Sequence, residues 1–170
     1  MLASARRHFA RENYENVGLR EIAGDAGVDP ALVCRYFGSK GQLFREAMHD
    51  EAFDLGRDAD PASLPEYLAD LLLSGAESTA KTERLLMMLH SFSSPQASAI
   101  ILEKIEGDIL SPVSAMLKGK DAACRAGLCL AALMGAGIML SALPSNAMQG
   151  ADPEMLRARL IAMFRAALAE

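Results

Sequence analysis

Apolar side chains recur every three or four residues along most of the chain, which is the pattern of amphipathic helices. The pattern predicts a first helix that stops near Asn13 and a second helix of about two turns that ends at Gly27. Asp29 is placed to cap a third helix that ends at Gly38, and Pro30 occupies its first turn, where a missing backbone N–H costs nothing. We therefore expect three short helices before residue 39.

Longer helices are predicted beyond this point. Ser39 can cap a helix over residues 40–57, and the stretch DADPASLP then breaks the pattern. Further helices are expected over residues 64–78, 82–93, 96–118, 121–143 and 153–169, with a loop over 144–152. We divide the chain into a first domain over residues 1–45 and a second over residues 46–170, connected by the helix at 40–57.

The composition supports an all-α fold. Only 5% of the 170 residues are aromatic and there is no Trp, whereas helix-forming Ala, Leu, Met, Glu and Arg are abundant. The length allows one or two domains and leaves no room for a large enzyme architecture. We predict an N-terminal three-helix domain followed by a C-terminal helical domain.

The charge is unevenly distributed between the two predicted domains. The net charge of -5 is unusual for a protein that binds nucleic acid. Residues 1–45, however, hold seven basic against five acidic residues, and the rest of the chain holds ten against seventeen. Because phosphate attraction needs only local positive charge, the first domain keeps the character of a DNA-binding head.

Small residues mark the predicted turn between the second and third helices. Two short helices can cross closely only where the side chains between them are small, and the turn needs a residue that accepts positive φ. Ala23 and Gly27, four residues apart, meet both needs, and Val28, Val33 and Phe37 supply the apolar contacts. The pattern predicts a helix-turn-helix unit. An ordinary helix pair of a bundle is the alternative, although the third helix is short and has a polar face.

The outward side of the third helix would then enter the major groove. The predicted DNA-binding residues are Pro30, Ala31, Leu32, Cys34, Arg35 and Tyr36, with Lys40 at the next helix start and Arg20 on the second helix. Arg35 is the natural reader of a guanine edge, whereas Tyr36 and Lys40 suit phosphate contacts. Leu32 and Ala31 suit thymine methyl groups. The alternatives are a solvated surface charge for Arg35, with the same doubt for Arg20, and a core ring for Tyr36.

A known family shares this pattern. The segment FARENYENVGLREIAGDAGVDPALVCRYFGSKGQLFREAM resembles the N-terminal part of the TetR family of bacterial repressors, and the resemblance covers residues 2–50. The residues in register are Phe9, Tyr14, Ile22, Ala23, Ala26, Gly27, Val28, Phe37, Ser39 and Lys40. The resemblance implies a homodimeric all-α regulator whose operator binding changes when a small molecule occupies the C-terminal domain. Val17 and Gly18 replace the family's usual hydroxyl caps, and Cys34 replaces a common phosphate-contacting Tyr.

The uncharged stretch over residues 126–143 is long enough to span a membrane. Its richness in Gly and Ala, after a DNA-binding head, favours a helix that packs closely against a second copy. The predicted interface combines Gly127, Ala131 and Gly135 with the apolar stripe Leu156, Leu160 and Met163 of the last helix. A two-fold homodimer predicts a palindromic operator and no membrane partner.

Methionines and one histidine are candidates for an effector cavity in the C-terminal domain. The predicted lining is Met87, Met88, His90, Phe92, Met116 and Met134, with Leu89 and Met139 nearby. Flexible thioethers suit a small apolar ligand, and filling the core is the equal alternative. For His90, a satisfied core or interface position is the alternative to orienting a ligand.

The sequence offers few candidates for disulfide, metal, cofactor or catalytic sites. Three cysteines without metal-ligand spacing indicate neither disulfides nor zinc, and they fit a reducing cytoplasm. A lone histidine supports no metal site, and no cofactor or catalytic motif is recognisable. We expect a DNA-binding transcriptional regulator and no enzyme. The alternatives are a helical protein–protein adaptor and a helix-turn-helix protein that responds to no ligand.

Overall fold

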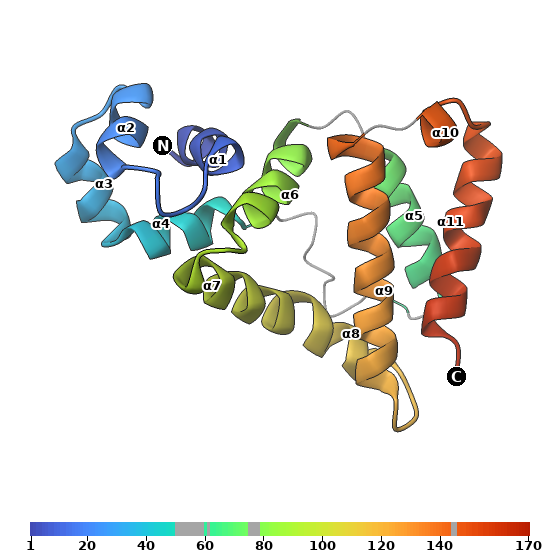
Figure 1. Cartoon of the computed structure of the whole chain (residues 1–170). Helices are drawn as coiled ribbons and strands as arrows, with labels where there is room; N and C mark the ends of the chain where they lie inside the picture. The colour runs from blue at the N-terminus through green and yellow to red at the C-terminus, as the bar shows by residue number, and fades with distance from the viewer. Residues whose placement is uncertain (50–59, 61, 75–78, 144–145) are drawn as a thin grey trace. The chain divides into compact units, whose positions relative to one another are not determined.

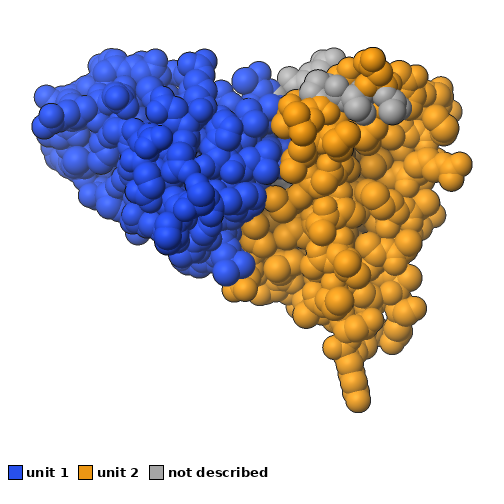
Figure 2. All heavy atoms as spheres, viewed as in Figure 1, with its two compact units in different colours: residues 1–51, 79–104 blue, residues 52–78, 105–170 orange. Residues whose placement is uncertain are grey.

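A computed structural model describes residues 1–49, 60, 62–74, 79–143 and 146–170, and within these ranges it contains helices and no strand (Figure 1). The predicted all-α class is therefore confirmed. The chain forms two compact units, which are coloured separately in Figure 2. Unit 1 comprises Met1–Glu51 and Thr79–Lys104, and unit 2 comprises Ala52–Ser78 and Ile105–Glu170. The predicted division into functional domains at residue 45 stays a prediction.

Unit 1 contains the three short helices predicted from the sequence. Its elements are α1 (Leu2–Arg11), α2 (Leu19–Asp25), α3 (Pro30–Phe37), α4 (Lys40–Ala47), α6 (Thr79–Ser91) and α7 (Pro95–Ile105), the last residue of which belongs to unit 2. Helix α1 packs against α4 and α6. The helix predicted over residues 82–93 thus begins three residues earlier, at Thr79.

Three aromatic rings form the centre of unit 1. Phe9 and Phe44 meet edge to face with 4.9 Å between ring centroids, and Tyr14 meets Phe44 in the same way at 5.2 Å. Phe9 and Tyr14 are stacked at 5.8 Å. All three side chains are buried, and such pairs add to the stabilisation from burial of apolar area. This cluster ties α1 and the loop after it to α4.

Helix α4 is shorter than predicted. The expected helix over residues 40–57 ends at Ala47, and the part of that prediction beyond His49 lies outside the described residues. A tertiary contact is present at this end of the helix. Arg6 of α1 donates from Nε to the Ala47 carbonyl at 2.8 Å and from Nη2 to the His49 carbonyl at 3.2 Å. It thereby satisfies carbonyl groups that a helix end leaves open.

Unit 2 is a second helical core. Its elements are α5 (Leu64–Ser74), η2 (Glu106–Leu110), α8 (Ser111–Met116), α9 (Ala122–Gly137), η3 (Ile138–Ala142), α10 (Asn146–Gln149) and α11 (Pro153–Leu168), where η marks a π-helical turn. Helix α11 packs on α5 and α9. Leu68, Leu133 and Phe164 from these three helices lie in the common core.

Several predicted helices are wrong in detail. The helix expected over residues 121–143 is α-helical to Gly137 and continues as η3, and the part of the helix expected over 64–78 that lies beyond Ser74 falls outside the described residues. The single helix expected over residues 96–118 is interrupted by η2, where the Ser111 N–H bonds to the Glu106 carbonyl five residues earlier. Pro112 follows at once, and its missing N–H and bulky ring disturb the regular α-helical bonding. The loop expected over 144–152 contains the single turn α10.

Candidate nucleic-acid interface

The turn between α2 and α3 closes through backbone hydrogen bonds. Gly27 has φ +65°, and its N–H bonds to the Gly24 carbonyl at 3.1 Å. The Val28 N–H bonds to the Ala23 carbonyl at 3.0 Å, which completes a Schellman motif. The predicted positive φ at Gly27 is confirmed. Ile22 and Ala23 are fully buried beneath this turn, so the crossing of α2 and α3 rests on the small and apolar residues expected there.

Helix α3 presents nearly its whole surface to solvent. Its N-cap, Asp29, accepts a hydrogen bond from the Ala31 N–H at 2.7 Å, and Gly38 ends the helix with φ +74°. Val33 is its buried residue, with 1% exposure. All six predicted contact residues of the helix are exposed: Pro30, Ala31, Leu32, Cys34, Arg35 and Tyr36. With Val33 buried and Phe37 half-buried, the helix therefore offers a largely apolar exposed face that carries one charged side chain, Arg35.

Tyr36 and Leu32 are notable on this face because large side chains are usually covered. Tyr36 is 70% exposed and Leu32 is 36% exposed. The alternative that Tyr36 is a core ring is therefore wrong. An exposed aromatic hydroxyl and an exposed apolar side chain suit contacts with phosphate and with a thymine methyl group, respectively.

The basic side chains of residues 1–45 differ in whether they form hydrogen bonds or ion pairs within the protein. Arg6 holds carbonyl groups, as described above, and Arg7 and Arg45 hold carboxylates. Three exposed arginines form no hydrogen bond or ion pair with the described part of the chain: Arg11, Arg20 and Arg35. Arg20 and Arg35 lie on the two helices of the helix-turn-helix unit, so their guanidinium groups are available for DNA.

Lys40, by contrast, is occupied within the protein. Its Nζ donates to the Val17 carbonyl at 3.1 Å and to the Glu15 carbonyl at 3.4 Å. It also lies 4.5 Å from the centroid of the Tyr14 ring. The sequence placed this ammonium group among phosphate contacts, whereas the structure places it on the loop between α1 and α2.

A carboxylate that the sequence reasoning missed joins α1 to the end of α2. Asp25 Oδ2 accepts hydrogen bonds from Ser4 Oγ at 2.5 Å and from Arg7 Nη2 at 2.6 Å, and His8 Nε2 lies 3.9 Å away. These hydrogen bonds, from Ser4 first and then Arg7, hold the pKa of Asp25 below its ordinary value. The one sequence signal is Ser4, a polar residue within the apolar stripe of α1.

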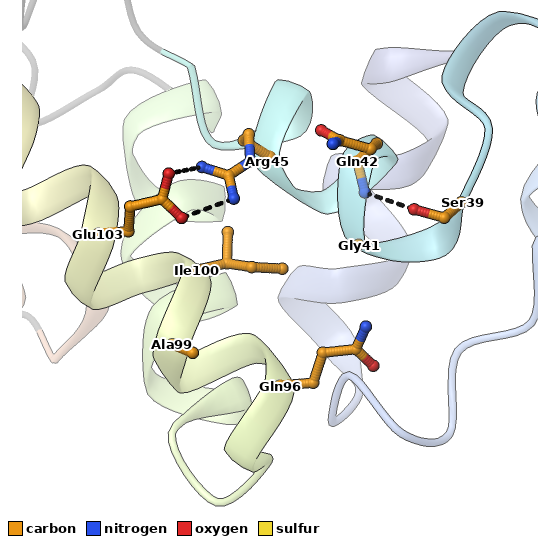
Figure 3. Close-up of a pocket in the computed structure, with 8 residues that line it drawn as sticks. All are labelled: Ser39, Gly41, Gln42, Arg45, Gln96, Ala99, Ile100 and Glu103. Atoms are coloured by element: carbon orange, nitrogen blue, oxygen red, sulfur yellow. Dashed lines mark hydrogen bonds and ion pairs between the residues drawn. The ribbon is translucent and has the colours of Figure 1, made fainter.

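A shallow polar pocket of about 350 Å³ lies between α4 and α7 within unit 1 (Figure 3). Arg45 and Glu103 face each other across it with two N–O distances of 2.7 Å. The hydrogen bonds from Arg45 lower the pKa of Glu103. Gly41 lies where α4 approaches α7, since a Cβ there would be 3.4 Å from Ile100 Cδ1. The sequence analysis singled out none of these residues.

The predicted effector residues are divided between the two units. Met87, Met88, His90 and Phe92 belong to unit 1, whereas Met116 and Met134 belong to unit 2. Met87 is fully buried, which fits the alternative of core filling, and Met134 packs against the core of unit 2. His90 and Phe92 are exposed, so the alternative that His90 is a core residue is wrong. No group of three possible metal ligands occurs among the described residues.

The predicted dimer residues also divide into two sets. Ala131 and Gly135 are exposed and Gly127 is half-buried on α9, and a Cβ added at either glycine would meet nothing within 4 Å. On α11, however, Leu160 is 4% exposed and lies in the core of its own unit, with Leu156 and Met163 packed against that core. The apolar stripe of α11 therefore packs inward. Its exposed side carries Met155, Ala158, Arg159, Ala162, Arg165 and Ala166.

The segment Ala122–Ala142, which comprises α9 and η3, contains an 18-residue stretch with a mean hydropathy of 1.8 and could span a bilayer by length and composition alone. A core helix of a water-soluble protein passes the same test. In this structure α9 packs against α5, α8 and α11. Cys129, Leu130 and Leu133 lie in the core of unit 2.

Comparison with known protein families matches both parts of the chain. Residues 1–47 match the family described as bacterial regulatory proteins, tetR family. Residues 62–168 match the tetracyclin repressor-like C-terminal domain. A stretch of 59 residues is 41% identical to the HTH-type transcriptional regulator BetI of Agrobacterium fabrum. That match covers 35% of this chain and 29% of the relative, less than a third of its length.

Solved structures share the arrangement of helices. NalD of Pseudomonas aeruginosa, the secondary repressor of the MexAB-OprM multidrug efflux pump, superposes with a TM-score of 0.72 at 16% identity, covering 99% of this chain and 94% of that one. A transcriptional regulator from Rhodococcus sp. Rha1 superposes with a TM-score of 0.67 at 24% identity, covering 98% and 93%. At sequence identities of 16% and 24%, these superpositions show a shared fold alone.

Proposed function

We propose, since this chain belongs to the TetR family of bacterial regulatory proteins, that it binds a palindromic DNA operator as a homodimer and represses transcription in the cytoplasm. Members of this family are transcriptional regulators and typically repressors. The finer parts of the proposal concern the residues that contact DNA, the dimer and the effector. Each is supported by a separate feature of the two units.

The observation that carries the proposal is the exposed face of α3. Arg35 is exposed and forms no hydrogen bond or ion pair with the described part of the protein, so its guanidinium can bond bidentately to a guanine edge. Leu32 and Ala31 offer apolar contacts for a thymine methyl group, and Pro30 and Cys34 complete the same surface. The rigid Schellman turn fixes this helix on α2, which keeps the reading side chains in a defined register.

We assign the phosphate contacts to Arg20 on α2 and to Tyr36 on α3. Arg20 stands in the first turn of α2 and is exposed without a partner among the described residues. The hydroxyl of Tyr36 can donate to a phosphate oxygen. With few such contacts per head, one protomer binds loosely, and two heads on one duplex add their contributions.

The exposed side of α9 supports the homodimer. Leu128 is 57% exposed, beside Ala131 and Gly135, on a helix that carries no charged residue beyond Arg125. The small residues allow the backbones of two copies to approach closely, and the exposed alanines of α11 offer a second small-residue surface. We therefore assign the interface to the outward faces of α9 and α11, without the inward stripe of Leu156, Leu160 and Met163.

The proposal also includes a small apolar effector that binds in unit 2. Its support is the match of residues 62–168 to a tetracyclin repressor-like domain. Met116 and Met134 in unit 2 remain candidates for the lining because their flexible thioethers adapt to irregular apolar ligands.

Binding-site selection from a randomised duplex library, followed by gel-shift titration over a range of salt concentrations, tests the proposal. We expect the full chain to enrich a palindrome whose half-sites lie about one helical turn apart. Affinity should fall steeply with salt, as phosphate contacts require. A folded dimer that retains no duplex at low salt would contradict the proposal and favour the protein–protein adaptor.

A further inference from the structure

We propose that this chain reads thymine in its operator through the C5-methyl group, and that each half-site places such a thymine within about two base pairs of the guanine bound by Arg35. The inference rests on the proposed DNA-binding function and deepens it, because it names the base content of the operator. One consequence is that 5-methylcytosine, which carries the same methyl group, replaces thymine in a half-site with little loss of affinity.

The first turn of α3 holds the positions that meet base edges and carries no polar side chain. A recognition helix contacts bases chiefly with the residues near its N-terminus. In α3 these residues are Pro30, Ala31 and Leu32, which are all exposed and whose side chains have no hydrogen-bonding group. The apolar group that the major groove offers is the C5-methyl of thymine. This turn therefore favours thymine by apolar contact.

The backbone around Leu32 is fixed on both sides. Asp29 Oδ1 accepts a hydrogen bond from the Ala31 N–H at 2.7 Å, and the Asp29 carbonyl accepts one from the Leu32 N–H at 2.9 Å. The next residue, Val33, is 1% exposed and anchors the helix. Leu32 is 36% exposed between these two attachments. Its apolar surface is thus presented in a defined direction before DNA binds, which limits the entropy cost of the contact.

The residues of the helix-turn-helix unit offer few alternative ways to read an A·T pair. Residues 19–39, all of which the structure describes, contain no Asn or Gln, the side chains that bond bidentately to adenine. Arg35, in the second turn of α3, suits guanine. An A·T pair in the half-site is therefore recognised from its thymine side, where the methyl group lies.

The spacing along α3 predicts where this thymine lies. Leu32 and Arg35 are three residues apart and Ala31 and Arg35 are four apart, so both apolar residues adjoin Arg35 on the helix surface. Cβ atoms at these spacings are about 5–6 Å apart. Successive base pairs are about 3.4 Å apart. The contacted methyl groups, on either strand, thus fall within about two base pairs of the guanine.

Base analogues in the palindromic duplex recovered by selection test the inference with the full chain. Each thymine is replaced by uracil in both half-sites, one symmetric pair at a time, which removes the methyl group alone. At a contacted position we expect a loss of about fourfold for each methyl group, and about fifteenfold for the two half-sites together. At the same position, a 5-methylcytosine·guanine pair should bind more tightly than a cytosine·guanine pair by a similar factor.

A variant assigns the contact to Leu32. In Leu32→Ala, the ratio of affinities for the thymine and uracil duplexes should fall towards one at the position that Leu32 contacts, because the partner of the methyl group is gone. Leu102→Ala is the matched control, since it removes a leucine that is 55% exposed on α7. This control should keep the full ratio.

Three results would overturn the inference. The first is equal binding of the thymine and uracil duplexes at every position near the guanine. The second is equal binding of the cytosine and 5-methylcytosine duplexes at those positions, and the third is a uracil penalty that keeps its size at every position in Leu32→Ala. If the unsubstituted chain retains no duplex, the proposed function itself fails. A retained palindrome without methyl dependence leaves that function standing and overturns the present inference alone.

Discussion

At the scale of single residues, the basic side chains of residues 1–45 fall into two groups. Some bind oxygen atoms within the protein, and others have no hydrogen bond or ion pair among the described residues. Arg6, Arg7 and Lys40 bind carbonyl or carboxylate oxygens within the protein, and Arg20 and Arg35 bind nothing in the described residues. A count of basic residues treats all five alike. The distinction comes from acceptors that lie far away in sequence, and it leaves Arg20 and Arg35 as the arginines of the helix-turn-helix unit without a partner among the described residues.

Replacing Arg35 with Ala should remove sequence preference and leave the fold intact. The lost bidentate bond is worth about 1–3 kcal/mol per half-site, so affinity for the selected duplex should fall at least tenfold. Affinity for a mixed-sequence duplex should change much less. Lys120→Ala, which removes an exposed charge in the loop before α9, is the control. Unaltered discrimination between the two duplexes would exclude Arg35 as a base reader.

Asp25 makes the stability of the head depend on pH. Its pKa is lowered in the folded protein by hydrogen bonds from Ser4 and Arg7, so its stabilisation is complete above the ordinary carboxyl pKa of about 3.9. That stabilisation is lost as the pH falls through the lower, folded value. Asp25→Asn should therefore lower the Tm at pH 7. The difference from the native chain should shrink on acidification below about pH 4, and a constant difference would contradict the charge-based account.

At the scale of secondary-structure elements, the helix ends are determined by different kinds of signal. Asp29 and Gly38 limit α3 through contacts within three or four residues, and the sequence therefore predicts its boundaries. At the end of α4 the Ala47 carbonyl is bound by Arg6, some forty residues earlier, although the pattern of apolar residues continues past this point. The interruption at η2 follows from Pro112, whose effect on a helix is local but was not anticipated.

Two glycines near the turn should respond in opposite ways to the same substitution. Gly27→Ala should destabilise the protein by about 1 kcal/mol, because φ +65° is unfavourable for an L-residue with a Cβ. Gly24→Ala should stabilise it by roughly 0.5–1 kcal/mol, since Gly24 lies within α2. Neither added methyl group meets an atom within 4 Å, so the pair isolates backbone conformation. Chemical denaturation measures both, and equal effects would contradict this explanation.

At the scale of the whole molecule, the proposed regulator depends on pairing two weakly binding heads. The chain as a whole carries a net charge of -5, so binding to DNA must be concentrated in the basic head. The outward face of α9 is the proposed means of pairing, because it is apolar, rich in small residues and uncovered within unit 2.

Ala131→Arg places a charge on this exposed face of α9. We expect a folded monomer, since the side chain points away from the core of unit 2, and at least a tenfold loss of affinity for the selected duplex. Ala115→Arg, at an exposed position of α8, is the matched control. Sedimentation measures the oligomeric state and circular dichroism the fold. If the variant still forms dimers, the interface does not lie on this face of α9.

The sequence by itself determined the all-α class, the limits of α3, the ends of α1 and α2 to within two residues, and the outward side of α3. These features follow from caps, glycines and apolar spacing, which act over a few residues. Tertiary structure alone decided that Lys40 turns inward, that Leu160 packs in its own core and that the predicted effector residues fall in two units. Periodicity shows that a helix has an apolar side, but the surface that covers this side depends on distant segments. The same holds for charges, because a side chain's partner is fixed only when the chain has folded.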